Sequence, residues 1–185
     1  MLDVTGLGEY IDAHFTRQAF RLETLAAYDV ASDASDVERY LRGEPDPDPA
    51  RKGPWLERLR RERHEGKCRQ RVHVVRSPLS DYLRYECEWG YLPNVAAGED
   101  IWILDLAERP RPVDLVDHDF WLLDDAHVIR MHYDGQGRFM GAEPLDRAQL
   151  PGYRRARDAA IKAAEPFLDY WRRRPEYHRA SWSAA

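Results

Sequence analysis

The hydrophobic period of the sequence changes near Arg71, and this change restricts the chain to folds that combine helices with a sheet. Before it, apolar residues recur at loosely helical spacing, which predicts helices. Four later segments are short, apolar and bounded by turn residues, which predicts strands: 71–78, 101–106, 119–125 and 127–134. A fifth short strand is expected within 138–145. The sequence therefore predicts an α/β (α+β) fold, in which a mixed sheet of about four to five strands is flanked by N-terminal helices and a long C-terminal helix.

The N-terminal part of the chain is expected to be helical. Residues 2–28 fit a helix pair or one broken helix, and a short helix should begin at Ser35 as N-cap and end before Gly43. In the EPDPDP tract that follows, alternating prolines lack backbone donors, so neither a helix nor a central strand can continue. We therefore predict a proline-rich loop over 44–54, followed by a third helix anchored by Trp55.

The strand 71–78 should be followed by a helix that starts near Ser77 and Pro78, and then by the strand 101–106. This order predicts a parallel, right-handed β-α-β unit. Near the end of the chain, 150–174 has helical periodicity, and Pro166 should kink or divide that helix.

The chain is expected to form one compact domain. It would consist of a helical region at 1–66, an α/β core with the C-terminal helix at 67–175, and a frayed tail at 176–185.

Charge and composition exclude several classes of function. Lys and Arg total 28 against 33 Asp and Glu, a formal net charge of −5, and the basic run 58–66 alternates with acids. We therefore expect no direct nucleic-acid binding. No run of 18 apolar residues and no signal-peptide pattern occurs, so we expect a cytoplasmic protein without a membrane segment. Cys68 and Cys87 form no CxxC pair, which argues against a disulfide framework and a thiolate metal site.

One acidic, imidazole-rich cluster has the composition of a divalent metal site. It consists of His118, Asp119, Asp124, Asp125, His127, His132 and Asp134. In a strand, however, His127 and His132 point to opposite faces and cannot converge without a bulge. We therefore interpret the cluster as turn carboxylates and edge-strand histidines, and we predict no metal and no cofactor.

A second polar cluster lies on the helix after the first strand, near Arg71. Asp81, Arg84, Tyr85 and Glu88 follow the i, i+3, i+4, i+7 spacing of one helical face. This face is either exposed and laced with ion pairs, which spacing alone favours, or it is a pocket wall with an Arg fork for a carboxylate or phosphate.

Sequence motifs do not name a reaction. The sequence contains no GxGxxG, GxxxxGK[ST], GxSxG or HExxH motif. The basic neighbours of Cys68 could lower its thiol pKa, but no general base is located beside it.

An ordered set of segments carries a family resemblance: RLETLAAYDV, RVHVVRSPLSDYLRYE, AAGEDI, DFWLLDD and HYDGQGRFMGAE. Together they resemble DUF6879, a family of small actinobacterial proteins of unknown function, from about Phe15 to Phe167. The family's recurring positions fall on residues that include Arg71, Tyr82 and Arg84, which adds weight to the pocket interpretation. The resemblance also implies a helix-turn-helix regulator as a partner.

The leading hypothesis is a ligand- or protein-binding regulatory or accessory module that recognises an anion. Its pocket should lie at the C-terminal ends of the strands that begin at Arg71 and Ile101, because open α/β sheets bind ligands at that edge. The expected ligand-binding residues are Arg71, Tyr82, Arg84, Tyr85 and Asp119.

The alternative is a small tailoring enzyme of secondary metabolism that uses a His and Asp pair for general acid-base catalysis. The candidate catalytic residues are His73, His127, His132, Asp119 and Asp134. Both hypotheses leave the oligomeric state open.

Overall fold

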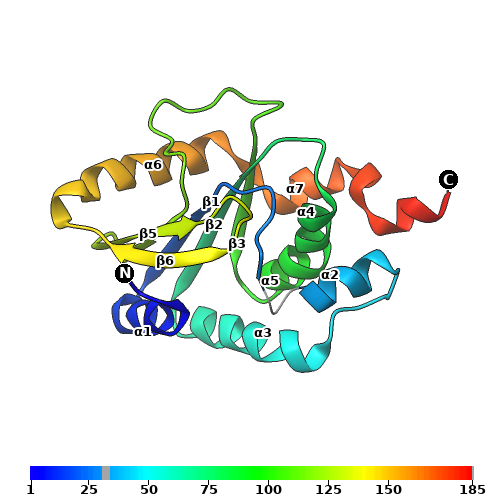
Figure 1. Ribbon diagram of the computed structural model, residues 1–185, viewed down its shortest axis with the longest axis horizontal. Helices are drawn as coiled ribbons and strands as arrows, with labels where there is room; N and C mark the ends of the chain where they lie inside the picture. Colours follow the sequence, from blue (N-terminus) through cyan, green and yellow to red (C-terminus); the bar gives the residue numbers. More distant parts are fainter. Residues whose placement is uncertain (31–33, 185) are drawn as a thin grey trace.

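The computed structural model describes residues 1–30 and 34–184, with side chains described up to Ser181. Its centre is a seven-stranded mixed sheet in the order β6-β5-β4-β1-β2-β3-β7 (Figure 1). The strands are β1 (Gln18–Glu23), β2 (Cys68–Val75), β3 (Asp100–Asp105), β4 (Phe120–Leu123), β5 (His127–Tyr133), β6 (Phe139–Pro144) and β7 (Glu165–Pro166). The mixed α/β class is as predicted, but the sheet has more strands than the expected four to five.

Parallel and antiparallel pairing meet at β1. This strand runs parallel to β2 and antiparallel to β4, and β2 in turn runs parallel to β3. The β1–β2 register sets Arg21 opposite Arg71 and Glu23 opposite His73. Within each strand these residues are two positions apart, and across the strands they are paired in register, so all four side chains lie on one face of the sheet.

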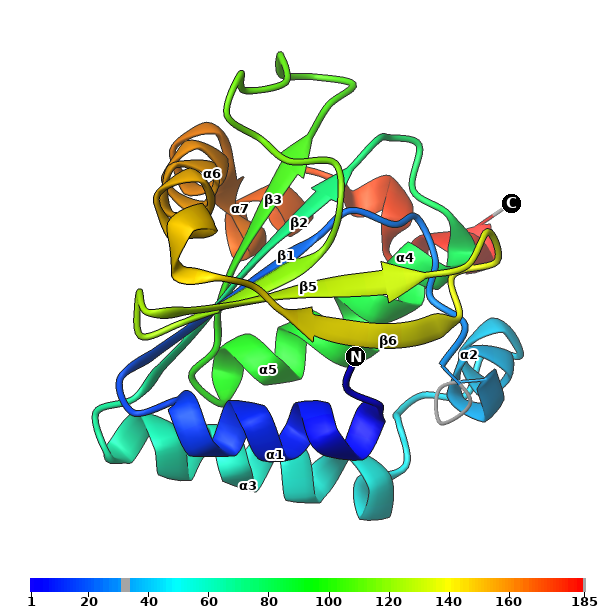
Figure 2. The same ribbon diagram turned by 60° about the vertical axis from the view of Figure 1, so that its left-hand side comes forward.

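The α-helices are α1 (Val4–His14), α2 (Ala34–Leu41), α3 (Pro49–His64), α4 (Asp81–Tyr85), α5 (Leu92–Ala96), α6 (Leu150–Ala163) and α7 (Phe167–Arg172). A π-helical segment, Glu86–Tyr91, joins α4 to α5. Figure 2 shows α6 on the opposite side of the sheet from α1, α3 and α5. No helix in the described residues is long and apolar enough to cross a membrane.

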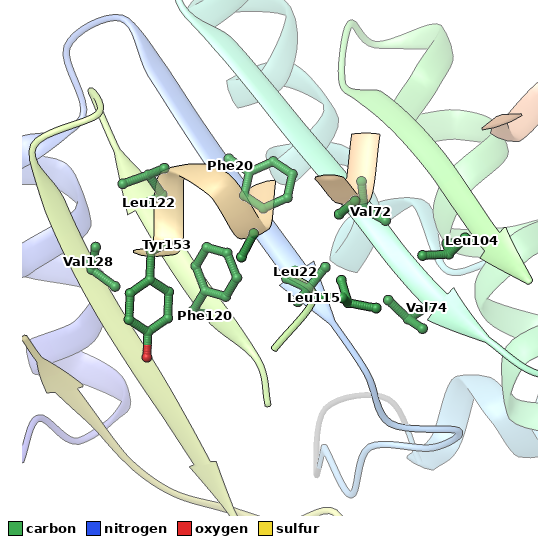
Figure 3. Close-up of a cluster of buried hydrophobic side chains, with 12 residues drawn as sticks. Phe20, Leu22, Val72, Val74, Leu104, Leu115, Phe120, Leu122, Val128 and Tyr153 are labelled. Carbon is green, nitrogen blue, oxygen red and sulfur yellow. The ribbon is translucent and has the colours of Figure 1, made fainter. Parts of the chain in front are cut away.

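The face beneath α6 is closed by an apolar core. Phe20 and Leu22 of β1, together with Val72 of β2, pack there against Tyr153 and Ala156 of α6 (Figure 3). This core explains why β1 and β2 alternate: every second residue must be apolar to contact α6.

The other face carries two separate apolar clusters. One cluster joins Phe15 and α1 to Trp121 and Ile129 of the antiparallel strands. The second joins Ile101 and Ile103 of β3 to α4, the π-helical segment and α7. Between the two clusters, β1 and β2 present polar side chains instead, and this position defines the site described below.

The N-terminal prediction is wrong in one respect. Residues 2–28 contain one helix, α1, followed by β1, and not a second helix. The sequence QAFRLE alternates along the strand, with Phe20 and Leu22 on one face and Arg21 and Glu23 on the other. Because the second face is buried although it is polar, its residues look like the exposed side of a helix.

Helix boundaries also differ from the predicted ones. Helix α2 begins at Ala34, so Ser35 lies inside it, whereas Gly43 follows its end with a φ of +83° as predicted. Helix α3 begins at Pro49 with Asp48 as N-cap, so the loop is shorter than 44–54.

Later in the chain, the helix after β2 starts after Ser80 and not at Ser77. The predicted parallel β-α-β unit is confirmed. Pro166 divides the C-terminal helix as expected, with β7 between α6 and α7. The tail forms short 3-10 turns, and Arg179 lies over the Tyr40 ring at 5.0 Å, so the expectation of a frayed tail is wrong at this residue.

Candidate functional site

A cavity of about 500 Å³ lies over β1 and β2, between the two apolar clusters of that face. Its volume is in the range of small-molecule sites. Strands β1, β2, β5 and β6 supply the floor, and residues of α1, α2, α3, α4, the π-helical segment and α5 supply the walls. The lining includes Arg21, Glu23, Tyr28, Arg51, Lys52, Arg71, Tyr82, Tyr85, Glu86, Tyr91, Asn94 and Tyr133.

The floor is a buried network of charges. Glu23 accepts from Arg71 Nη1 at 2.7 Å and pairs with Arg21 Nη2 at 2.9 Å. Arg71 also donates through Nε to Glu99 Oε1 at 3.0 Å, and Asn94 Nδ2 donates to Glu99 Oε2 at 2.7 Å. The facing register of β1 and β2 makes this network possible, because it places Arg21 beside Arg71 on one face.

Glu86 stands at the edge of this network without a guanidinium of its own. It is the first residue of the π-helical segment, and its Oε2 is buried and accepts no hydrogen bond from the described residues. The nearest titratable partner is His73, whose Nδ1 lies 3.5 Å from Glu86 Oε2. Single π-helical turns inside helices frequently occur at functional sites.

His73 is fully buried and its two ring nitrogens have different roles. Nε2 lies 2.9 Å from the Leu25 carbonyl oxygen, which can only accept, so Nε2 donates. In the neutral ring Nδ1 then accepts, and it lies 2.6 Å from the Tyr91 hydroxyl. That hydroxyl is also 3.1 Å from Glu23 Oε2, and its single proton can be donated to only one of these two acceptors at a time. Tyr91 therefore lies between His73 and the charge network.

The surroundings give Glu23 and Glu86, two carboxyl groups that line the cavity, very different pKa values. Burial opposes ionisation of Glu23, but the charges of Arg21 and Arg71 outweigh it and lower its pKa to about 2. Burial raises the pKa of Glu86 to about 7, and the negative charge of Glu23 adds to this effect. Glu86 is therefore the cavity carboxyl that changes charge near neutral pH.

Glu23, His73 and Glu86 also form a potential metal-ligand set, since one ligand atom from each lies within 4.8 Å of the others. However, both oxygens of Glu23 already face guanidinium groups, Arg21 on Oε1 and Arg71 on Oε2. A divalent cation would have to displace Arg71 and would lie beside two fixed positive charges. This arrangement opposes metal binding.

Three of the five predicted ligand-binding residues line the cavity: Arg71, Tyr82 and Tyr85. Asp119 lies behind the wall, where it accepts from the Tyr28 hydroxyl at 2.6 Å and from Thr24, so it orients Tyr28. Arg84 points elsewhere, with its guanidinium 5.5 Å from the centre of the Tyr177 ring. The cavity lies over Arg21 and Arg71 on the sheet face, and neither β3 nor the last residues of β2 line it, so it is not at the predicted strand ends.

The predicted catalytic histidines are not brought together. His73 borders the charge network, whereas His127 lies against His14 with ring centroids 4.2 Å apart. His132 pairs with Glu143 at 3.1 Å, and Asp134 caps the following turn through the backbone of Gln136. Within the described residues, no hydrogen bond or ion pair joins one of these histidines to Asp119 or Asp134. The carboxyl nearest His73 is instead that of Glu86, at 3.5 Å.

Cys68 does not have an activated thiol. Burial and a hydrogen bond to Asp100 Oδ2 at 3.1 Å raise its pKa to about 11. The basic neighbours in the sequence predicted the opposite direction, because their side chains were assumed to face the sulfur. Cys87 is buried.

Sequence reasoning missed Arg21, Glu23, Glu86 and Tyr91. A signal existed for the strand residues, because Arg21 and Glu23 alternate with Phe20 and Leu22 just as Arg71 and His73 alternate with Val72 and Val74. Two neighbouring strands with charged residues on one face indicate a buried polar site. For Glu86 the residue spacing carried no signal, because a π-helical turn has no distinctive residue pattern here; only the family resemblance, which counts Glu86 among its recurring positions, pointed to it.

Comparison with known proteins places the chain in a family. No curated protein matches the sequence. The sequence does match the family described as a domain of unknown function (DUF6879), over residues 6–172. The match covers most of the 185 residues, including every strand and every cavity-lining residue except Val4. The chain is therefore a member of the DUF6879 family.

Proposed function

We propose that the protein is a ligand-binding regulatory or accessory module, and that it binds a small organic molecule in the cavity over β1 and β2. One observation carries this proposal. Arg21 Nε, Glu86 Oε2 and Asn94 Oδ1 are buried without a hydrogen-bond partner in the described part of the chain, and all three residues line this cavity. Buried polar groups are normally paired, so three unpaired groups on residues that line one cavity suit a polar ligand.

The energetic cost of the floor supports the same proposal. Glu23, Arg71 and Glu99 are buried. A buried group of paired charges often stabilises a fold no more than an apolar core of equal volume does. Local rules of packing tend to be broken at functional sites, and here a polar strip divides two apolar clusters.

Native mass spectrometry tests the proposal. The purified protein is exposed to an extract of cellular small molecules, desalted and weighed. We expect a reproducible added mass that Glu86→Gln reduces, whereas Asp81→Asn, a change on an exposed side chain of the neighbouring helix, retains it. The proposal is contradicted if the unmodified protein shows no added mass after desalting. It is also contradicted if Glu86→Gln and Asp81→Asn retain the added mass equally.

The regulatory part of the proposal concerns a protein partner, for which a helix-turn-helix regulator is the candidate. In that case ligand binding should change the affinity for the regulator, which can be measured with and without the molecule identified above.

A second candidate function is proton-transfer catalysis in the same cavity. It is favoured by the pKa of about 7 at Glu86, because general bases work best near the ambient pH. In this case the bound molecule should be converted to a product of different mass, and Glu86→Gln should slow that conversion more than it weakens binding. Unchanged substrate mass after prolonged incubation removes this candidate.

A further inference from the structure

The charges of the cavity point to the class of its ligand. We propose that the ligand is a small organic cation, an aryl-alkyl ammonium, whose positive group faces Glu86. This inference rests on the proposed binding function and specifies which chemistry the cavity selects.

The first step is the balance of charge on the floor. Arg21 and Arg71 supply two positive charges, whereas Glu23, Glu86 and Glu99 supply three carboxylates. Each guanidinium is already paired with Glu23, and Arg71 also with Glu99. His73 Nδ1 lies 3.5 Å from Glu86 Oε2 and is the only other group of the network that could carry a positive charge there. When Glu86 is ionised and the His73 ring is neutral, one negative charge therefore remains without a cation in the network, and a ligand cation would balance it.

The second step is the chemistry of the unpaired atoms. Two of the three atoms without partners, Glu86 Oε2 and Asn94 Oδ1, are acceptors. An ammonium group is a compact charge that donates up to three hydrogen bonds and accepts none. It therefore suits this wall better than a carboxylate or phosphate would.

The third step is the aromatic lining. Tyr82 and Tyr85 lie on the same wall with ring centroids 6.0 Å apart, and Tyr28, Tyr91 and Tyr133 complete the lining. Rings attract cations through their negative faces, and Arg71 already lies 5.4 Å from the Tyr91 centroid. The rings also provide apolar surface for the aryl part of the ligand.

The outer part of the cavity has the opposite sign. Arg51 pairs with Asp36 at 3.3 Å, and Lys52 Nζ lies 3.4 Å from the Gly90 carbonyl oxygen. The excess of carboxylate is thus confined to the floor, so the ammonium should point inward. The sequence predicted an anion here, but Arg71 is engaged by two carboxylates and Arg84 lies outside the cavity.

Three probes with one skeleton test the charge preference: 2-phenylethylamine, 2-phenylethanol and 3-phenylpropionate. Binding to the full chain is followed by the shifts of backbone amide signals in nuclear magnetic resonance titrations. We expect the amine to bind at least about tenfold more tightly than the alcohol, and the propionate to bind most weakly. Glu86→Gln should weaken only the amine, by about tenfold, and Asp81→Asn should change none of the three.

The pH dependence in the unmodified protein gives an independent test. The groups facing Glu86 are Glu23 and Arg21 of β1 and Arg71 and His73 of β2. Because Glu86 ionises near pH 7, amine binding should tighten as the pH rises from about 6 to about 8, whereas binding of the alcohol should stay constant. A positive ligand also favours the ionised carboxyl, so binding should release a proton in this range.

The outcomes separate the two proposals. Tighter binding of the propionate, or amine binding that ignores both pH and Glu86→Gln, overturns the cation inference and leaves ligand binding by the cavity in place. No shift of cavity residues with any probe also overturns it, while the native mass result still decides the proposed function. Zn²⁺ alone shifting the signals of Glu23, His73 and Glu86 would assign the site to a metal and overturn the inference as well.

Discussion

At the scale of single residues, two carboxyl groups show how the surroundings set acidity. Asp124 is partly buried, which opposes ionisation. Its carboxylate nevertheless accepts hydrogen bonds from the backbone N–H groups of residues 16–18, which lower its pKa to about 2. Glu86 lacks such donors, and burial raises its pKa to about 7. The same functional group therefore favours folding when ionised at one place and opposes it at the other.

The effect of Glu86 on stability has a definite sign. The pKa of Glu86 rises from an ordinary 4.5 in the unfolded chain to about 7 in the folded protein, because the fold favours the protonated carboxyl. The free energy of unfolding is therefore highest, as far as Glu86 affects it, below pH 4.5, and it falls as the pH rises to 7. Glu86→Gln removes this loss. We expect the variant to gain about 1–3 kcal/mol over the unmodified protein between pH 4.5 and pH 8, measured by urea unfolding at both values. The control Asp81→Asn should show the same pH dependence of stability as the unmodified protein. If Glu86→Gln shows that same pH dependence too, Glu86 is not desolvated.

At the scale of elements, the strands with apolar runs were predicted from the sequence, whereas β1 was missed although its residues alternate. Strands β3, β4 and β5 are bounded by turn residues and lie close to their predicted ranges. Strand β1 has only six residues, and its second face carries Arg21 and Glu23. Pattern reasoning assigns polar residues to solvent, and this assumption fails where a site is buried.

The predicted polar face of the helix after β2 shows a related difficulty. Its spacing assumed one regular α-helix, but the backbone widens into a π-helical turn at Glu86. Glu88 then accepts from the Tyr40 hydroxyl at 2.8 Å, while Tyr85 lines the cavity. One predicted face is thus divided between a packing contact and the cavity, so Tyr85 lines the cavity and Arg84 lies outside it.

The turn between β5 and β6 provides a prediction at this scale. Gly137 has a φ of +81°, and a Cβ there would lie 2.6 Å from the Ala27 carbonyl oxygen. The Gly137 carbonyl accepts from Asp29 N–H at 3.0 Å, so this turn holds the segment that carries Tyr28. We expect Gly137→Ala to cost about 2–3 kcal/mol in urea unfolding, because the backbone of both segments must move.

Gly135 in the same turn is a matched control, because a Cβ there meets nothing within 4 Å. Gly135→Ala should change the free energy of unfolding by less than about 0.5 kcal/mol. Equal effects of the two substitutions would show that the approach of Gly137 to Ala27 does not hold the segment in place.

At the scale of the whole molecule, distant parts of the chain meet around the cavity. Arg179 near the C-terminus donates through Nη2 to the Pro45 carbonyl at 2.9 Å and through its backbone N–H to Glu88 at 3.1 Å. Its guanidinium lies over Tyr40 of α2. The last turns thereby hold α2 against the helices that form the cavity wall.

Arg179→Ala should loosen α2. We expect a loss of about 1–2 kcal/mol in urea unfolding, because a cation over a ring and several hydrogen bonds to the chain are removed together. Trypsin should also cleave faster after Arg42, which lies between α2 and the proline-rich loop. In the control Arg172→Ala, the removed side chain is 75% exposed and pairs with Asp169 at the surface, so neither measurement should change. Unchanged cleavage in both variants would contradict this role of Arg179.

The pairing of β1 with β2 couples the site to the folding of the molecule. Each strand sends one set of side chains into the core under α6 and the alternate set into the cavity floor, as Phe20 and Arg21 do in β1. The two strands join across a long intervening segment, so their pairing requires closure of a large loop. Separation of the strands destroys the core and the cavity in the same step. Amide hydrogens beneath the cavity should therefore exchange with solvent only through global unfolding, which makes the site part of the most cooperative unit of the fold.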